Sequence, residues 1–375
     1  MSKKNNKTSF YCKTCHKKLY NLSIGDVSLP IDEKIVDVMS KALIEQKIKN
    51  KFKGYPPEIG YDFLKEKIAS YYKQKNVLIN SDDVFVSNGA GCDLGNLLDL
   101  FEKNKVVIQD PTYPAYFDSS VIKGMEIVLL DANKENDYLV SPKSLKEENY
   151  IIYLCSPNNP TGRTFTYSEL KIWVDFCIKT NSVIIYDVAY ESFVEENFVK
   201  SIYQIENAKK CAIEVGSFSK LAGFTNFRCG WTIVPKELTR NNKKLNELWE
   251  RRQCTFFNGV PYFIQKGAEY VLTKNGLKIC QNNIKYYKNN AKMLKNALKS
   301  INFDFVETNN SPYVWLACPQ KYSSWEFFDL LLKEYNIVGI PGCAFGKNGE
   351  GYFRFSAFCE NKDIEKVCEI LQKLK

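Results

Sequence analysis

The sequence predicts an α/β fold with a mostly parallel β-sheet, and short apolar runs carry this prediction. Four runs have the length and composition of buried strands; they lie at residues 106–110, 151–155, 183–187 and 211–215. The ends of the last three are about 30 residues apart, which leaves room for a helix and favours parallel pairing. Because ligands collect at the carboxyl ends of strands in such sheets, we expect the functional site there.

The segments around these strands complete the expected large unit. Residues 60–72 have the periodicity of an amphipathic helix. Residues 87–92 read SNGAGC, a loop expected to open a helix at 93–101 and to offer backbone N–H groups to a phosphate. The run at 231–234 follows Lys220 by about ten residues, too few for a parallel crossover, so we expect an antiparallel strand there.

The C-terminal third alternates helices and strands. Helices are expected at 240–255, 260–300, 324–335 and 362–374, and strands at 313–317, 337–341 and 351–357. Together with the N-terminal arm, this pattern is typical of a small α+β domain packed against the large sheet. The predicted organisation is an arm at 1–30, a large domain at 31–260 and a small domain at 261–375 that includes a linking helix.

Composition narrows the class of protein. The 375 residues are 45% hydrophobic and 25% charged, as in an ordinary globular enzyme. The formal charge of +9 suits anionic ligands, but the lysines are spread along the chain and form no tract typical of nucleic-acid binding. No apolar run has the length of a membrane span, about 18 residues. Thirteen cysteines without a secretory leader indicate free thiols in the cytoplasm.

Histidine and cysteine patterns exclude several chemistries. His16 is the only histidine, so neither a Ser-His-Asp triad nor a histidine-based metal site is expected. The segment from Cys12 through Cys15 to His16 matches the C-x-x-C-H pattern of haem attachment. Haem attachment would need an exported chain, and zinc would need further ligands nearby. We therefore predict no metal.

Residues 214–231, which read EVGSFSKLAGFTNFRCGW, contain a more specific pattern. Lys220 follows Ser217 and Ser219, and Arg228 comes eight residues later. A lysine amine can condense with an aldehyde, while hydroxyls and a guanidinium bind phosphate, which are the needs of pyridoxal 5'-phosphate. Arginine is scarce, with only six in the chain, because lysine supplies positive charge elsewhere. Where arginine does occur, we therefore expect its planar guanidinium to bind an anion through two hydrogen bonds. The alternative is a surface lysine in a polar loop.

The segment resembles the lysine segment of class I aminotransferases of the pyridoxal phosphate fold type I. It is most similar to the LL-diaminopimelate aminotransferases, in which SFSK-x-AGFT-x-x-R-x-GW is characteristic, and the resemblance runs from about Gly25 to Phe358. It implies a seven-stranded, mostly parallel sheet between helices, and a homodimer with shared active sites. It also implies exchange of an amino group between LL-diaminopimelate or a related amino acid and 2-oxoglutarate.

The resemblance assigns residues around the cofactor ring. Lys220 would form a Schiff base and later move a proton at the substrate Cα. Asp187 ends a predicted buried strand, where an unpaired carboxylate is costly, and would keep the pyridine nitrogen protonated; alternatively it caps the following helix. Asn159 and Tyr190 would hydrogen-bond the phenolic oxygen, although NNPTG alone is merely a turn. Tyr113 would stack on the ring, unless it is an ordinary packed tyrosine.

The resemblance also assigns a phosphate cup and a substrate site. The expected phosphate ligands are Ser217, Ser219, Arg228 and the Ala90-Gly91 loop, with Tyr55 reaching across the dimer. The expected substrate residues are Arg354 for the α-carboxylate, Gly25 and Asn159 beside it, and Asn258 and Glu58 from the other subunit. Glu58 would meet the distal ammonium of diaminopimelate.

Two departures from the family pattern concern the substrate. Gly91 stands where the diaminopimelate enzymes typically have a lysine, in the sequence from Gly89 to Asp93. The family also has a tyrosine in a longer N-terminal arm, and neither Tyr11 nor Tyr20 is in register with it. The alternatives are therefore a same-fold enzyme acting on another amino acid, as a transaminase, lyase or oxidase, or a non-catalytic binding module of this fold.

Overall fold

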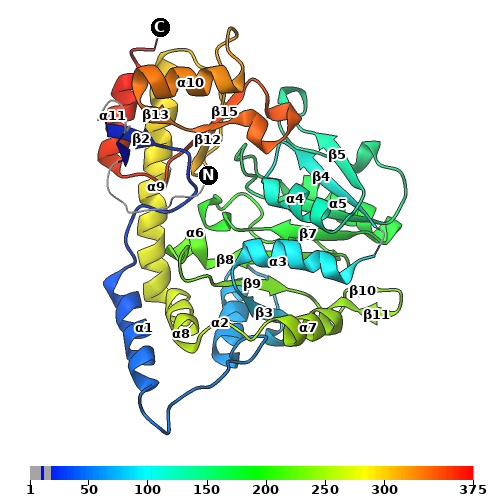
Figure 1. Cartoon of the computed structure of the whole chain (residues 1–375). Coiled ribbons are helices and arrows are strands. Elements are labelled where there is room, and N and C mark those ends of the chain that lie inside the picture. Colours follow the sequence, from blue (N-terminus) through cyan, green and yellow to red (C-terminus); the bar gives the residue numbers. More distant parts are fainter. Residues whose placement is uncertain (1–9, 12–17, 103, 375) are drawn as a thin grey trace.

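A seven-stranded β-sheet organises the larger part of the molecule. The structure is a computed structural model that describes residues 10–11, 18–102 and 104–374 (Figure 1). The strand order is β3-β9-β8-β7-β6-β4-β5. The strands are β3 (Val84–Ser87), β4 (Lys105–Asp110), β5 (Ile127–Asp131), β6 (Tyr150–Cys155), β7 (Val183–Asp187), β8 (Ala212–Ser217) and β9 (Gly230–Ile233). Only β9 runs antiparallel to its neighbours, so the predicted sheet and its antiparallel strand are confirmed.

Helices cover both faces of this sheet because its strands are apolar on both faces. In β6, Ile152 and Leu154 belong to one core cluster, and Ile151 and Tyr153 belong to the other. This is the alternation expected of a strand buried on two sides. The first face packs against α2 (Asp62–Lys73), α5 (Tyr167–Thr180) and α8 (Tyr262–Val271), and the second against α3 (Ala90–Asn96), α4 (Pro114–Ile122) and α7 (Leu245–Phe256).

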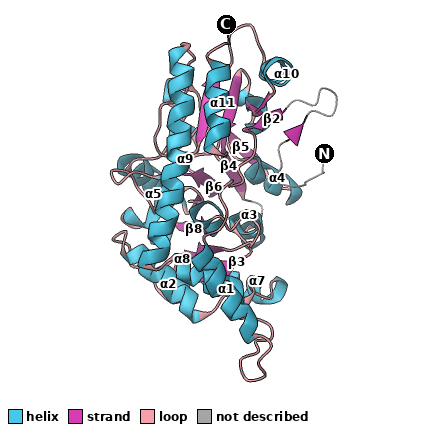
Figure 2. Cartoon of the chain, turned by 90° about the vertical axis from the view of Figure 1, so that its left-hand side faces the viewer, coloured by secondary structure: helices cyan, strands magenta, loops and turns pink. Residues whose placement is uncertain are grey.

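Two small β-sheets gather around α9 (Lys274–Ser300), the long helix that Figure 2 shows upright. One three-stranded sheet has the order β12-β15-β14, with β12 (Tyr313–Ala317), β14 (Ile340–Pro341) and β15 (Tyr352–Ser356). A second joins β1 (Phe10–Tyr11) and β2 (Lys18–Asn21) to β13 (Ile337–Val338). The other helices are α1 (Glu33–Glu45), α6 (Phe218–Ala222), α10 (Ser324–Tyr335) and α11 (Asn361–Leu371). The domain boundaries at residues 30 and 260 stay a prediction.

Several predicted elements differ in detail. The helix expected at 260–300 is two helices, because Thr273 caps α9 by accepting a hydrogen bond from Gly276 N at 3.1 Å. The strand expected at 337–341 is divided between two sheets at Gly339, where a Cβ would lie 2.2 Å from Cε1 of Phe353. The helix expected from residue 93 begins at Ala90, and a hairpin of β10 (Thr239–Arg240) and β11 (Lys243–Lys244) precedes α7.

Two predictions concern segments outside these elements. The Cys12-x-x-Cys15-His16 motif lies outside the described residues. Among the residues that the structure does describe, no helix combines the length and the apolar character needed to cross a bilayer.

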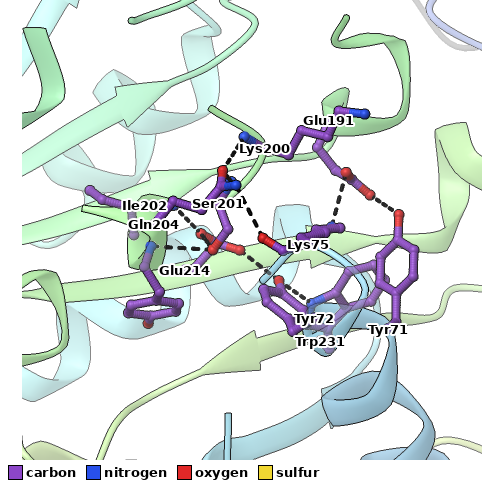
Figure 3. Close-up of polar contacts among 11 residues, drawn as sticks. Tyr71, Tyr72, Lys75, Glu191, Lys200, Ser201, Ile202, Gln204, Glu214 and Trp231 are labelled. Carbon is purple, nitrogen blue, oxygen red and sulfur yellow. Dashed lines mark hydrogen bonds and ion pairs between the residues drawn. The ribbon is translucent and has the colours of Figure 1, made fainter. Parts of the chain in front are cut away.

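A buried polar network fastens α2 to the sheet (Figure 3). Glu214 of β8 is fully buried and accepts hydrogen bonds from Tyr72 Oη at 2.6 Å, Ser201 Oγ at 2.8 Å and Ile202 N at 2.7 Å. Trp231 Nε1 donates to Tyr72 Oη at 2.9 Å. Because each acceptor is satisfied, this carboxyl links α2, β9 and the segment that leads into β8.

The second half of the network holds the loop after β7. Lys75 Nζ lies 3.0 Å from Glu191 Oε2, and both side chains are buried. Tyr71 Oη donates to the other oxygen of Glu191. The ammonium also sits over the Tyr71 ring, 3.9 Å from its centroid. Glu191 directly follows Tyr190, so this ion pair fixes the backbone on which Tyr190 stands.

The network makes a prediction about stability and pH. Burial raises the pKa of Glu214 to about 7, above its ordinary value of 4.5. The folded state therefore holds this proton more tightly than the unfolded state, and stability falls as pH rises from about 5 to 8. Relative to Glu214→Gln, which cannot titrate, the wild type should lose about 3 kcal/mol of unfolding free energy over this range. Urea unfolding at pH 5 and pH 8 measures it; an unchanged difference between the proteins would contradict the assignment.

Candidate active site

A cleft of about 730 Å³ opens at the carboxyl ends of β6, β7 and β8. It lies where the sequence places the functional site, since each of these strands ends in a loop that contributes to its walls. The predicted site residues that line it are Gly25, Ala90, Gly91, Tyr113, Asn159, Asp187, Tyr190, Ser217, Ser219, Lys220, Arg228 and Arg354.

Lys220 stands on α6, whose N terminus is capped by Ser217. The Ser217 hydroxyl accepts a hydrogen bond from Ser219 N at 3.0 Å, which turns the chain from β8 directly into the helix. Lys220 Nζ donates to Gly25 O. Burial lowers the pKa of this amine to about 8; Asp26 opposes the shift, and Arg354 and Arg228 add to it. An amine with this pKa is about one-tenth neutral, and thus nucleophilic, at pH 7, far more than an ordinary lysine.

Asp187 ends β7 and faces the cleft as a buried carboxyl. Its Oδ2 accepts a hydrogen bond from Tyr116 Oη at 2.6 Å, and its Oδ1 accepts one from Ala189 N at 2.8 Å. Burial raises the pKa of Asp187, and these two hydrogen bonds oppose the shift. The Ala189 contact is a local cap, so this carboxyl both shapes the turn after β7 and presents itself to the cleft.

Two tyrosines meet in the wall of the cleft. The hydroxyls of Tyr190 and Tyr313 are 2.7 Å apart, and burial raises the pKa of both. Gly25 passes close beside them, because a Cβ there would lie 2.5 Å from Tyr313 Oη. Any side chain at Gly25 would therefore displace this pair.

Arg354 lies in β15 and is 4% exposed. Its Nη1 donates to Asn159 Oδ1 at 2.7 Å, and its Nη2 donates to Ser23 O at 2.7 Å. The guanidinium sits over the ring of Tyr313 at 4.1 Å and over that of Phe345 at 4.8 Å. Its hydrogen-bond acceptors are all neutral and its buried Nε has none, so the guanidinium is poised for an anion in the cleft.

A cluster of N–H, hydroxyl and guanidinium donors forms one end of the cleft. Ala90 and Gly91 open α3, while Ser217 and Ser219 come from the start of α6. Arg228 joins them, with its backbone in the left-handed region at φ 53° and its Nη1 donating to Thr225 O at 3.1 Å. Such a set of donors matches the needs of a phosphate.

The sequence profile described as "Aminotransferase class I and II" matches residues 17–371 of the chain. The chain belongs to this family. It is therefore an aminotransferase, and the predicted function class is confirmed.

Individual relatives within the family show a more specific similarity. An LL-diaminopimelate aminotransferase of Prochlorococcus marinus subsp. pastoris is 44% identical over 371 residues, which cover 94% of this chain and 90% of the relative. One from Lachnospira eligens is 42% identical over 373 residues, covering 96% and 92%. Among solved structures, the L,L-diaminopimelate aminotransferase of Chlamydomonas reinhardtii is similar with a TM-score of 0.89 and 35% identity, covering 95% and 90%. BacF of Bacillus subtilis, in a substrate-bound structure, is similar with a TM-score of 0.85 and 26% identity.

Three predicted residues of this aminotransferase lie away from the cleft of their own chain. Tyr55 is 86% exposed, and Tyr55 and Asn258 line a separate hollow of about 650 Å³. Glu58 lines neither the cleft nor that hollow. A single chain thus does not bring Tyr55, Glu58 and Asn258 to Lys220. Their predicted action across a dimer stays a prediction.

Sequence reasoning missed several residues that line the cleft of the aminotransferase. Tyr116 is the hydrogen-bond partner of Asp187, and its spacing of three residues from Tyr113, at the start of a helix, was a usable signal. The Arg354 guanidinium lies over the rings of Tyr313 and Phe345, and both residues come from segments with no local motif. Only the folded arrangement brings them to the cleft.

Proposed function

We propose that this aminotransferase binds pyridoxal 5'-phosphate in the cleft around Lys220. The residues present fit the group: the cleft combines an amine of lowered pKa, a buried carboxyl, an aromatic ring and a donor cluster. Tyr113 supplies the ring; it lines the cleft and is 37% exposed, which leaves part of its surface available to a planar ligand. Bound there, the cofactor would supply an electron sink that makes the substrate Cα–H acidic.

Each residue then has a task that its chemistry supports. Lys220 would bind the cofactor covalently and, once free, would carry the proton from the substrate Cα. Asp187 would favour the protonated form of the pyridine nitrogen. Tyr190 and Asn159 would donate hydrogen bonds to the phenolic oxygen. Asn159 already accepts a bond from Arg354, which leaves its amide N–H groups available for that oxygen.

Arg354 binds the α-carboxylate that every amino-acid substrate carries. The single observation that carries this role is a buried guanidinium whose acceptors are neutral, in the same cleft as Lys220. A carboxylate would supply the missing charge through two parallel hydrogen bonds.

We propose LL-diaminopimelate as the amino substrate and 2-oxoglutarate as its partner. The support is the identity of 42–44% with proteins named LL-diaminopimelate aminotransferase, over at least nine-tenths of each relative. Gly91 favours a second candidate, transfer from a different amino acid. A Cβ at Gly91 would have no neighbour within 4 Å, so the space that a lysine occupies in the family pattern is open.

A half-reaction screen tests both proposals. The protein loaded with pyridoxal 5'-phosphate is mixed with single amino acids, and the change in cofactor absorbance is followed. We expect LL-diaminopimelate and glutamate to react faster than other amino acids. Borohydride should fix the cofactor on Lys220 in a peptide map. A label on another residue would overturn the cofactor site, whereas a faster reaction with another amino acid would overturn only the substrate.

We also propose a homodimer that completes each active site with Tyr55, Glu58 and Asn258 of the other subunit, in a cytoplasmic enzyme. The hollow that Tyr55 and Asn258 line is bordered by large apolar side chains that are exposed in the single chain, among them Leu43 and Phe52. Such a patch indicates an interaction surface. The described cysteines are all free, as suits a reducing compartment.

Mixing two inactive variants is expected to restore activity in such a dimer. In a Lys220→Ala/Asn258→Ala heterodimer, one site has both residues intact and the other lacks both. Statistical mixing should therefore return about a quarter of the wild-type rate. Activity is measured after co-refolding the two variants, with each variant refolded alone as the control. Verified heterodimers without activity would show that the sites are not shared.

A further inference from the structure

A second cleft, of about 500 Å³, lies along α9 and shares no lining residue with the Lys220 cleft. One wall is the exposed side of α9, the long helix in Figure 2. The other is formed by the segment that leads into β12, including Phe305, Asn309 and Ser311, and by Glu195 from the loop after β7.

Lysines dominate this second cleft. Its lining contains Lys285, Lys288, Lys292, Lys295 and Lys299, whose spacing of three and four residues places them on one face of α9. The lining carboxylates are Glu195 and Glu307, so five positive charges face two negative ones. Like charges at this spacing repel one another along a helix, so these lysines lower the stability of α9.

Lys295 is buried and Lys288 is half-buried, and neither forms an ion pair with a carboxylate of the described residues. Lys295 is 8% exposed, and its Nζ donates to Thr308 O and to Asn309 Oδ1. Lys288 Nζ donates to Phe193 O at 3.0 Å. Burial lowers the pKa of both lysines; Glu307 and then Glu195 oppose the shift at Lys295, and Glu195 opposes it at Lys288. Their acceptors are neutral, so the positive charge of the cleft is not balanced within it.

We propose that this cleft binds a small, multiply charged anion of the phosphate or polycarboxylate class through Lys285, Lys288, Lys292 and Lys295. The volume is in the range of small-molecule sites, about 300–1,000 Å³. Lysines offer mobile point charges rather than a planar fork, which suits a ligand whose several charges point in different directions.

An anion bound in this second cleft would affect the active site through the hydrogen bonds of the cleft walls. Lys288 holds the carbonyl of Phe193, in the turn after Tyr190, and Glu195 N donates to Asn310 Oδ1 at 2.9 Å. On the other wall, Tyr313 N donates to Ser311 Oγ at 3.0 Å. Because the Tyr190 and Tyr313 hydroxyls meet in the Lys220 cleft, an anion that draws these walls together changes their spacing. This consequence for turnover rests on the proposed function, whereas the binding itself does not.

Isothermal titration of the enzyme loaded with pyridoxal 5'-phosphate tests the site, with sodium pyrophosphate and citrate titrated separately at constant ionic strength. Saturable binding of one or both anions is expected, at one per chain. The double variant Lys285→Ala/Lys292→Ala should weaken it about 10-fold or more. Both lysines are exposed, so the fold should tolerate the change.

The matched control is Lys274→Ala/Lys278→Ala, which removes the same charge from exposed positions of the same helix but outside the cleft. It should bind as the wild type does. Equal affinity in all three proteins, equal weakening in both double variants, or no saturable binding of either anion would each overturn the proposal. Binding of only pyrophosphate or only citrate would identify the ligand class.

Discussion

Replacing Lys220 with methionine is expected to lower kcat for amino transfer by about 10⁴-fold or more, because the proposed covalent anchor and proton carrier are lost together. Methionine keeps most of the side-chain volume but has no amine. Among the described residues that line the cleft, Lys220 is the only lysine, and the other cations that affect the pKa of its amine are the guanidiniums of Arg228 and Arg354. Single-turnover kinetics with LL-diaminopimelate and with glutamate measure the loss.

A stability measurement separates this loss from misfolding. Burial disfavours the charged form of Lys220, as its lowered pKa shows, so removing the charge should not destabilise the fold. The apo form of Lys220→Met should therefore melt at or above the temperature of apo wild type. A variant that keeps more than about 1% of the wild-type kcat would contradict the role of Lys220 as the proton carrier.

Local patterns in the sequence located much of the cleft because its residues follow strand ends. Asp187 is the last residue of a buried run, whereas Asn159 and Lys220 each stand a few residues beyond one, and parallel pairing of those runs brings all three to one edge. The antiparallel strand β9 was also predictable, since the connection from α6 is too short for a crossover. These features depend on spacing alone.

Contacts between distant segments were not predictable in this way. Tyr190 and Tyr313 are 123 residues apart in the chain, and nothing local around Tyr313 marks it. The lysines of α9 read as a solvated helix face until the segment before β12 is placed against them. The division of 337–341 at Gly339 reflects close packing against Phe353, which periodicity does not record. Long-range packing decides each case.

Replacing Arg354 with lysine is expected to lower kcat/KM by about 10- to 150-fold for every amino-acid substrate, because one charge-assisted hydrogen bond of about 1.5–3 kcal/mol is lost. The guanidinium reaches Asn159 and the Ser23 carbonyl with separate nitrogens while its face lies on Tyr313. A lysine keeps the charge but cannot hold this arrangement. Steady-state kinetics with diaminopimelate and glutamate should show similar losses, since both carry the α-carboxylate.

The hydrogen bond between Arg354 and Asn159 allows a second, more specific test with a double variant. Asn159→Ala alone removes a proposed cofactor contact, and in combination with Arg354→Lys its effect should be less than additive, because the arginine orients the amide. Arg163 does not line the cleft, so Arg163→Lys is the control for replacing an arginine with a lysine and should leave kcat/KM unchanged. A loss at Arg354→Lys confined to one substrate would mean that Arg354 recognises the distal end of that substrate, not the carboxylate that all of them share.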